Sequence, residues 1–295
     1  MNYRKLIPTL LMLLAILCGC ASEVPPAQIA ATTLPVYEFT CRITEGTGLS
    51  VTRLVTEEVS CLHDYSLNVK QVKAAESAEL IVISGAGLEA FLEDLLLDTN
   101  ILDASKEIEL LCPEEGHGHD HGHEEEDHHH EKDPHIWLSP VNAAAMAQTI
   151  CDGLCQTYPQ HAEAFAANLL ALTTEIEAVA VYGRQTLASL SCRKMITFHD
   201  GFAYFAEAFG LQILEAVEEE SGSEASAKEL IHLIQEVEHH NLPAVFTEKS
   251  GSVSAADIIS RETGCGCFML DMAMAGHSWF DAMYYNIDTI KEALG

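Results

Sequence analysis

The sequence predicts an α/β protein of two lobes, each with a parallel sheet, joined by one long helix. Short β-branched runs alternate with helical stretches in both halves, which is the pattern of a parallel sheet covered by helices. Between the halves lies a stretch of helical periodicity far longer than any other. A chain of 295 residues is also long enough for two domains that each bury a core.

The first lobe is predicted from several short segments. Short β-branched runs and helical stretches follow one another at residues 28–34, 36–43, 49–55, 69–76, 79–84 and 88–97. A strand-like segment comes next, at 101–111. A further apolar helix begins at Pro140 and is broken by Pro159. We therefore assign residues 20–158 to the N-terminal lobe.

The connecting helix is predicted over residues 159–190. Its apolar residues recur at three- or four-residue steps, with Gly183 the only weak point. About thirty helical residues span roughly 45 Å, which suits a rod between two lobes. The second lobe, 191–295, repeats the first: strands are expected at 194–198, 211–217, 244–248 and 267–271, and helices at 201–210, 227–240, 254–264 and 279–294.

The N-terminus has the layout of a secretory signal. Arg4 and Lys5 precede an apolar run too short to span a bilayer comfortably. The run ends in Leu17-Cys18-Gly19-Cys20, which resembles the lipobox of bacterial lipoproteins. We expect residues 1–19 to be removed and Cys20 to anchor the protein by lipid on the extracytoplasmic face of the cytoplasmic membrane. The alternative is an uncleaved or ordinarily cleaved signal. No other stretch is predicted to be apolar enough to cross a membrane.

The charge of the chain bears on its binding partners, and its cysteine content bears on disulfides. A formal net charge of −30 argues against nucleic acid and favours cations. Eight cysteines remain besides Cys18 and Cys20, and in an exported chain disulfides are the default expectation. Eight cysteines allow 105 pairings, so no connectivity is predicted.

A segment between Glu114 and Asp133 cannot form a packed core. It holds nine acidic residues, one lysine and seven histidines, a composition typical of disorder and of weak, exchanging metal contacts. These histidines are His117, His119, His121, His123, His128, His129 and His130. The alternative is a dispensable solvated loop.

Four side chains are candidate metal ligands: His63, His135, His199 and Asp271. Each lies just after a predicted strand or in a loop, and open parallel sheets bind ligands beyond the carboxyl ends of their strands. Three imidazoles and one carboxylate complete a tetrahedral zinc shell. Any one of these histidines alone has an ordinary surface or core role as often as not; the combination carries the prediction.

Four segments, 61–94, 133–140, 196–211 and 244–271, resemble in order and spacing the zinc-specific substrate-binding lipoproteins of ABC importers. The resemblance implies two Rossmann-like lobes joined by a rigid helix, with the metal between them. It places the family's ligands at His63, His135 and His199, with Asp271 at the acidic fourth position. Manganese-binding relatives resemble this pattern with glutamate at the third position, so His199 favours zinc. The residues Gly-Cys-Gly-Cys before the last strand depart from the family pattern.

Two further sets of residues could take part in the metal site. Glu248, at a strand end, could orient a ligand histidine or cap the following helix. Cys265 and Cys267 share one face of a strand and could bind zinc as thiolates, although disulfides or free thiols are the preferred interpretation.

The sequence thus predicts a monomeric protein, not an enzyme, that captures Zn²⁺ and delivers it to the permease and ATPase of an ABC importer. The alternatives are a Mn²⁺ or Fe²⁺ importer protein, a zinc hydrolase with Glu248 as base, or an adhesion lipoprotein. The hydrolase lacks an HExxH motif.

Overall fold

The computed structural model describes residues 27–57, 62, 65–92, 100–111, 132–217, 225–249 and 251–295. The predicted signal and Cys20, His63 and all seven histidines of the His-rich segment lie outside the described residues. So does the second half of the predicted helix at 88–97, residues 93–97.

The N-terminal lobe is built on a parallel sheet with strand order β2-β1-β3-β4. Ile29 and Ala31 face α2, whereas Ala30 faces the opposite side with α3, so β1 is buried on both faces. Asn68 begins α3 with a reciprocal capping box to Gln71. The elements are β1 (Ile29–Ala31), α2 (Leu34–Ile43), β2 (Val51–Arg53), α3 (Val69–Ser77), β3 (Leu80–Ile83) and β4 (Ile101–Asp103).

The C-terminal lobe repeats this arrangement with strand order β6-β5-β7-β8, again all parallel. Its elements are β5 (Lys194–Thr197), α6 (Ala203–Phe209), β6 (Gln212–Ala216), α7 (Ala227–His240), β7 (Ala244–Glu248), α8 (Ser254–Thr263), β8 (Gly266–Leu270) and α9 (Trp279–Leu294). The two sheets with covering helices confirm the predicted α/β fold class.

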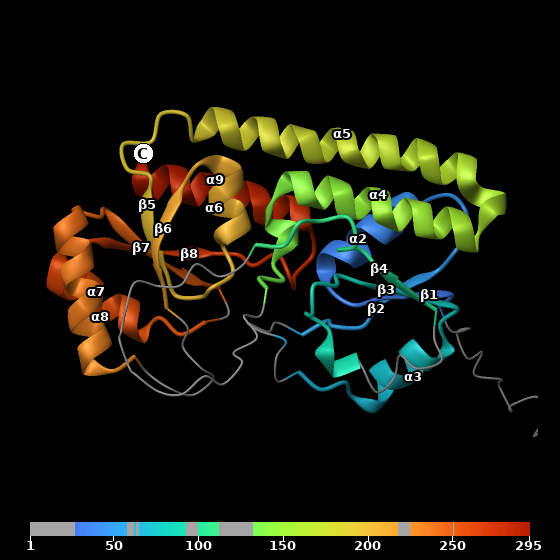
Figure 1. The fold of residues 1–295 in the computed structure, drawn as a ribbon, viewed down its shortest axis with the longest axis horizontal. Coiled ribbons are helices and arrows are strands. Elements are labelled where there is room, and N and C mark those ends of the chain that lie inside the picture. Colours follow the sequence, from blue (N-terminus) through green and yellow to red (C-terminus); the bar gives the residue numbers. More distant parts are fainter. Residues whose placement is uncertain are drawn as a thin grey trace, which may run out of the picture.

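Helices bridge the two lobes. Figure 1 shows α5 (Ala162–Thr186) running along both groups of strands, with α4 (Pro140–Thr157) packed beneath it and α9 beneath its other end. The helix α5 ends where Arg193 donates to the carbonyls of Leu187 and Ala188, which satisfies part of the free C-terminal end. The division of the chain at residues 158 and 190 stays a prediction.

The main hydrophobic core is continuous between the lobes. Buried residues of β1 and β3 belong to the same cluster as buried residues of β5, β7 and β8, joined through α4, α5 and α9. Smaller clusters lie under α3 and under α7 and α8. The largest cluster of buried residues is therefore shared by the two sheets.

Two expectations differ from the structure. The segment 101–111 keeps only three residues of strand, because the Asp103 carboxylate accepts hydrogen bonds from the amide and hydroxyl of Ser105 and turns the chain.

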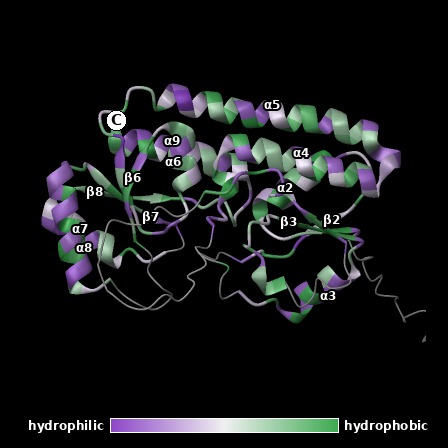
Figure 2. Cartoon of the chain, in the orientation of Figure 1, coloured by the Kyte–Doolittle hydropathy of each residue, from purple (hydrophilic) through white to green (hydrophobic). Residues whose placement is uncertain are grey.

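Residues Pro159–Thr186 are long and apolar enough to cross a membrane by length and composition. Figure 2 shows hydrophobic residues mixed with hydrophilic ones along α5, and its Phe165, Leu172 and Ile176 are buried against the protein.

Gly183 has a packing reason to interrupt the periodicity of α5. A Cβ atom at this position would lie 2.2 Å from Cε1 of Phe209, on α6. The glycine therefore lets α6 approach the connecting helix.

Replacing Gly183 by alanine should lower the free energy of unfolding by about 1–2 kcal/mol, because the overpacking against Phe209 outweighs the better helix propensity of alanine. Urea denaturation of the metal-free protein measures the change. In a Phe209→Ala background the clash is absent, and the same substitution should stabilise the protein instead. Equal destabilisation in both backgrounds would contradict this role of Gly183.

Candidate metal centre

Three of the candidate residues lie along one edge of the C-terminal sheet. His199 follows β5 by two residues, Glu248 ends β7, and Asp271 follows β8 directly. Because β5, β7 and β8 are parallel neighbours, their carboxyl ends meet at the same edge. The edge thus brings together chain segments that are far apart in sequence.

His135 approaches from the N-terminal lobe side, just before the short 3-10 turn η3 (Ile136–Leu138) and α4. It is 6 % exposed. Its Nδ1 lies 2.8 Å from Oδ1 of Asp133, which also accepts the His135 backbone N–H. An ionised carboxylate only accepts hydrogen bonds, so Nδ1 carries the proton and Nε2 is left with its lone pair. Asp133 therefore sets the tautomer that a metal ligand needs.

The imidazoles of His135 and His199 meet with their Nε2 atoms 3.4 Å apart. Their rings are nearly perpendicular, with centroids 5.1 Å apart. Two nitrogens bound to one tetrahedral zinc at about 2.0–2.1 Å are separated by roughly 3.3 Å. The separation of the two Nε2 atoms therefore matches that of two nitrogen ligands of one zinc ion.

Asp271 is held differently. Its Oδ2 is 2.9 Å from Nζ of Lys249, and its Oδ1 accepts the N–H of Ala273 at 2.8 Å. The buried Asn286 of α9 bonds both the backbone N–H and the carbonyl of Asp271. Among the described residues, no three His, Cys, Asp or Glu side chains are grouped as for a metal ion. Asp271 as fourth ligand and His63 as third stay predictions.

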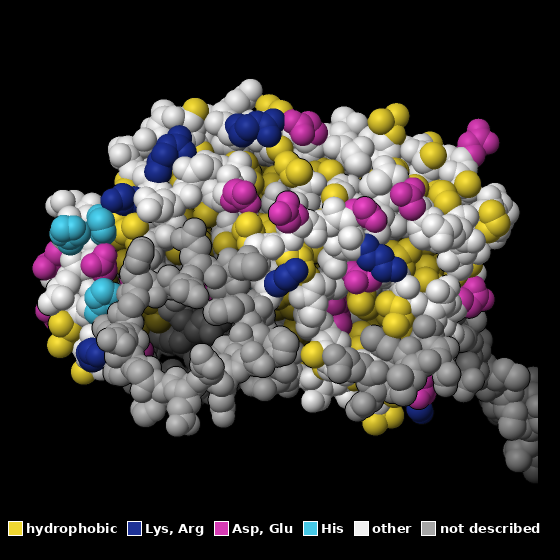
Figure 3. Space-filling view, viewed as in Figure 1, with side chains coloured by type: hydrophobic (Ala, Val, Ile, Leu, Met, Phe, Trp, Pro, Cys, Tyr) yellow, Lys and Arg dark blue, Asp and Glu magenta, His cyan; other side chains and the backbone are white. Residues whose placement is uncertain are grey.

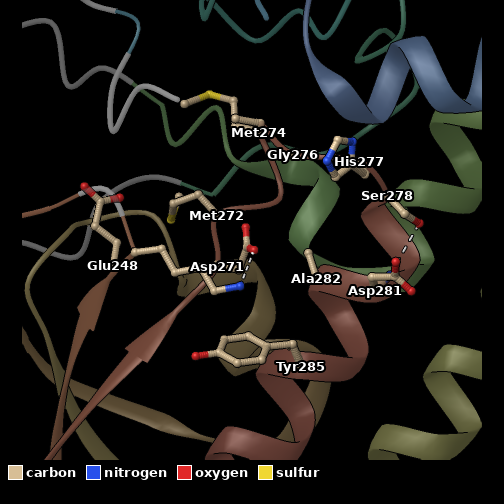
Figure 4. Close-up of a pocket in the computed structure, with 12 residues that line it drawn as sticks. Glu248, Asp271, Met272, Met274, Gly276, His277, Ser278, Asp281, Ala282 and Tyr285 are labelled. Atoms are coloured by element: carbon tan, nitrogen blue, oxygen red, sulfur yellow. Dashed lines mark hydrogen bonds and ion pairs between the residues drawn. The ribbon is translucent and has the colours of Figure 1, made fainter. Parts of the chain in front are cut away.

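Glu248 is buried and lines a cavity of about 440 Å³ beside Asp271. Burial raises the pKa of its carboxyl from 4.5 to about 7. Its Oε2 has no hydrogen-bond partner within the described part of the chain. In Figure 4 the Glu248 carboxylate points away from Asp271. The capping alternative finds no support, since no side chain caps α8, whose N-cap residue is Val253. The orienting role stays a prediction.

Two tryptophans tie the ligand-bearing segments to each other. The Trp137 indole N–H donates to the Met272 carbonyl at 2.7 Å, and the Trp279 indole N–H donates to the Trp137 carbonyl at 2.9 Å. Trp137 is two residues from His135, and Met272 is next to Asp271. These fully buried side chains fix the two sides of the site relative to each other.

The base of the His-rich segment is closed by hydrogen bonds. The Asp133 N–H donates to the Leu111 carbonyl, and the Leu111 N–H donates to the hydroxyl of Tyr204. That hydroxyl donates to the Asp133 carbonyl. Tyr204 of α6 thus binds the two chain ends between which the segment lies.

Two further histidines, on α7, have charged neighbours. Figure 3 shows histidines gathered over α7; there His232 lies near Glu215, and His240 contacts Lys194 and Glu236. The cysteines in the described ranges are free thiols, against the expectation of disulfides: Cys41, Cys151, Cys155, Cys192, Cys265 and Cys267. Burial raises the pKa of Cys267, which disfavours a thiolate ligand there.

Sequence reasoning missed Lys249 and Tyr204 as determinants of the site. Lys249 follows Glu248 directly, and its place beside Asp271 follows once β7 and β8 are known to pair in parallel. No comparable pattern in the sequence indicates the hydrogen bonds of Trp137 and Tyr204.

Known proteins share this architecture. The family model "ZnuA: Zinc-uptake complex component A periplasmic" matches residues 29–293. The zinc-binding lipoprotein AdcA of Streptococcus pneumoniae is 28 % identical over 278 residues, which cover 90 % of this chain and 55 % of AdcA. The chain thus spans about half the length of that relative.

Solved structures agree with the sequence matches. A crystal structure of ZnuA is 28 % identical, with a TM-score of 0.77 over 91 % of this chain and 100 % of the other. The Zn(II)-bound ZnuA-like domain of Streptococcus pneumoniae AdcA is 25 % identical, with a TM-score of 0.75 over 90 % of this chain and 98 % of that domain. These matches confirm the resemblance seen in the sequence.

The raised pKa of Glu248 has a consequence for stability. Between pH 4.5 and about 7 the folded protein keeps a proton on Glu248 that the unfolded chain has lost. The free energy of unfolding therefore falls as the pH rises through this range. Metal-free protein should lose about 2 kcal/mol more unfolding free energy between pH 5 and 8 than its Glu248→Gln variant. Denaturant titrations at both pH values measure this. Glu262→Gln, at an exposed carboxylate, is the control, and parallel pH profiles for wild type and Glu248→Gln would contradict the prediction.

Proposed function

Since the chain belongs to the ZnuA family of periplasmic zinc-uptake components, we propose that it is an extracytoplasmic protein that captures Zn²⁺ between its lobes. It passes the ion to the permease of an ABC importer, whose ATPase drives transport. The observation that carries the proposal is the pair of imidazoles of His135, before α4, and His199, after β5, with their Nε2 atoms 3.4 Å apart.

The proposed ligands are His63, His135, His199 and Asp271. Neutral imidazole is a favoured ligand for zinc, and the nitrogen of His199 disfavours Mn²⁺, which prefers hard oxygen. The net charge of −30 attracts the cation. The His-rich segment would add weak contacts that raise the local concentration of zinc near His135.

The protein is proposed to be anchored to the membrane and to have no enzymatic activity. Lipid at Cys20 would hold the protein at the membrane, in line with the relative described as a lipoprotein. The protein works as a monomer and not as an enzyme. Full coordination by side chains leaves no open position for an activated water, which a zinc hydrolase requires.

Substituting His135 or His199 by alanine should weaken zinc binding at least about hundredfold, because each removes a nitrogen from the metal shell. Deleting residues 116–130 should weaken it far less. Isothermal titration with Zn²⁺, and with Mn²⁺ as competitor, measures both. His161→Ala, on a surface turn, is the matched control. Wild-type affinity in both histidine variants, or displacement of Zn²⁺ by equimolar Mn²⁺, would refute the proposal.

The Asp133→Asn substitution should weaken zinc binding about tenfold, because an amide polarises the Nδ1 proton of His135 less than a carboxylate does. Asp152→Asn, an exposed position on α4 that accepts a hydrogen bond from Gln148, removes the same charge elsewhere and should change little. Equal affinities for the two variants would show that Asp133 does not act through His135.

A further inference from the structure

Lys249 forms an ion pair with Asp271, the carboxylate that we expect to be the fourth ligand of the candidate metal site. Its Nζ lies 2.9 Å from Oδ2 of Asp271 and 3.8 Å from the centre of the Tyr285 ring. The Tyr285 hydroxyl donates to the Met269 carbonyl, which fixes the ring. Figure 4 shows Asp271 and Tyr285 on the same side of the cavity. The ammonium group is thus bound between a carboxylate and an aromatic face.

The position of Lys249 follows from the sheet. Its backbone N–H donates to the Leu270 carbonyl and extends the pairing of β7 with β8 by one residue. The register of β7 and β8 therefore places Lys249 beside Asp271. Asp271 itself is fixed by Asn286 and by the Ala273 N–H, so the mobile partner of the ion pair is the lysine.

We propose, on the basis of the zinc-binding function above, that Lys249 is an internal competitor of Zn²⁺ for Asp271. In the metal-free protein the ammonium group neutralises the carboxylate and keeps it away from the His135–His199 pair. When zinc binds, Asp271 must either release Lys249 or accept the ion beside an existing positive charge. Both routes lower the affinity relative to a protein without the lysine.

The ion pair is suited to such reversible competition. The Lys249 side chain is 44 % exposed and that of Asp271 24 % exposed, so water screens the pair and its separation costs little. The Tyr285 face, together with Glu248 and Asp281 on the wall of the same cavity, offers the displaced ammonium group an alternative place. Lys249 thereby speeds zinc release as well as weakening zinc binding, which serves a protein that must surrender its cargo.

Replacing Lys249 by methionine tests the proposal. Zinc should bind about fivefold more tightly and dissociate more slowly into a chelator in stopped-flow measurements. Lys249→Arg keeps the positive charge and should remain close to wild type. Lys228→Met, at an exposed position of α7 in the same lobe, controls for the change in net charge.

The effect must pass through Asp271. In an Asp271→Asn background, Lys249→Met should raise zinc affinity much less, because the histidines remain and the carboxylate for which Lys249 competes is gone. Unchanged or weaker binding by the single variant, or the same gain in both backgrounds, would overturn the role of Lys249. Failure of the underlying zinc site is recognised separately, because the His135→Ala and His199→Ala variants would then bind zinc like wild type.

Discussion

The geometry of the candidate metal centre depends on one buried hydrogen bond, from the Trp137 indole to the Met272 carbonyl. It joins the segment that carries His135 to the segment that carries Asp271, and the Trp279 indole bonds to Trp137 in turn. Loss of such a bond would leave a carbonyl buried without a partner, at a cost of about 1–3 kcal/mol. The two sides of the site are thus set by apolar packing and backbone acceptors rather than by the metal.

This constraint limits how the protein can open. The main core runs without interruption from the N-terminal sheet through α4, α5 and α9 to the C-terminal sheet. A wide hinge motion would expose that packed surface to water, which is unfavourable in proportion to the apolar area exposed. Changes on metal binding are therefore expected in side chains at the cleft, such as Lys249 and Asp271, more than in the relative placement of the sheets.

Sequence reasoning reached the order of strands and helices in the second lobe, because periodicity is a local property. The expectation that His135 and His199 share one site came from the family resemblance. Sequence reasoning extended the strand at 101–111 too far, since the bond from Ser105 to Asp103 depends on side-chain geometry. It missed the continuous core and the pairing of Lys249 with Asp271, which depend on how the sheets and helices pack. The free thiols of six cysteines likewise depend on their separation in space.

The hydrogen bonds of Tyr204 at the base of the His-rich segment also bear on how such proteins diverge. Leu111 and Asp133 are bonded to each other and to Tyr204 regardless of what chain lies between them. Because the entropy of closing a loop grows only slowly with its length, residues can be gained or lost there at little cost to folding. The number of histidines in this segment can therefore vary while His135 keeps its position.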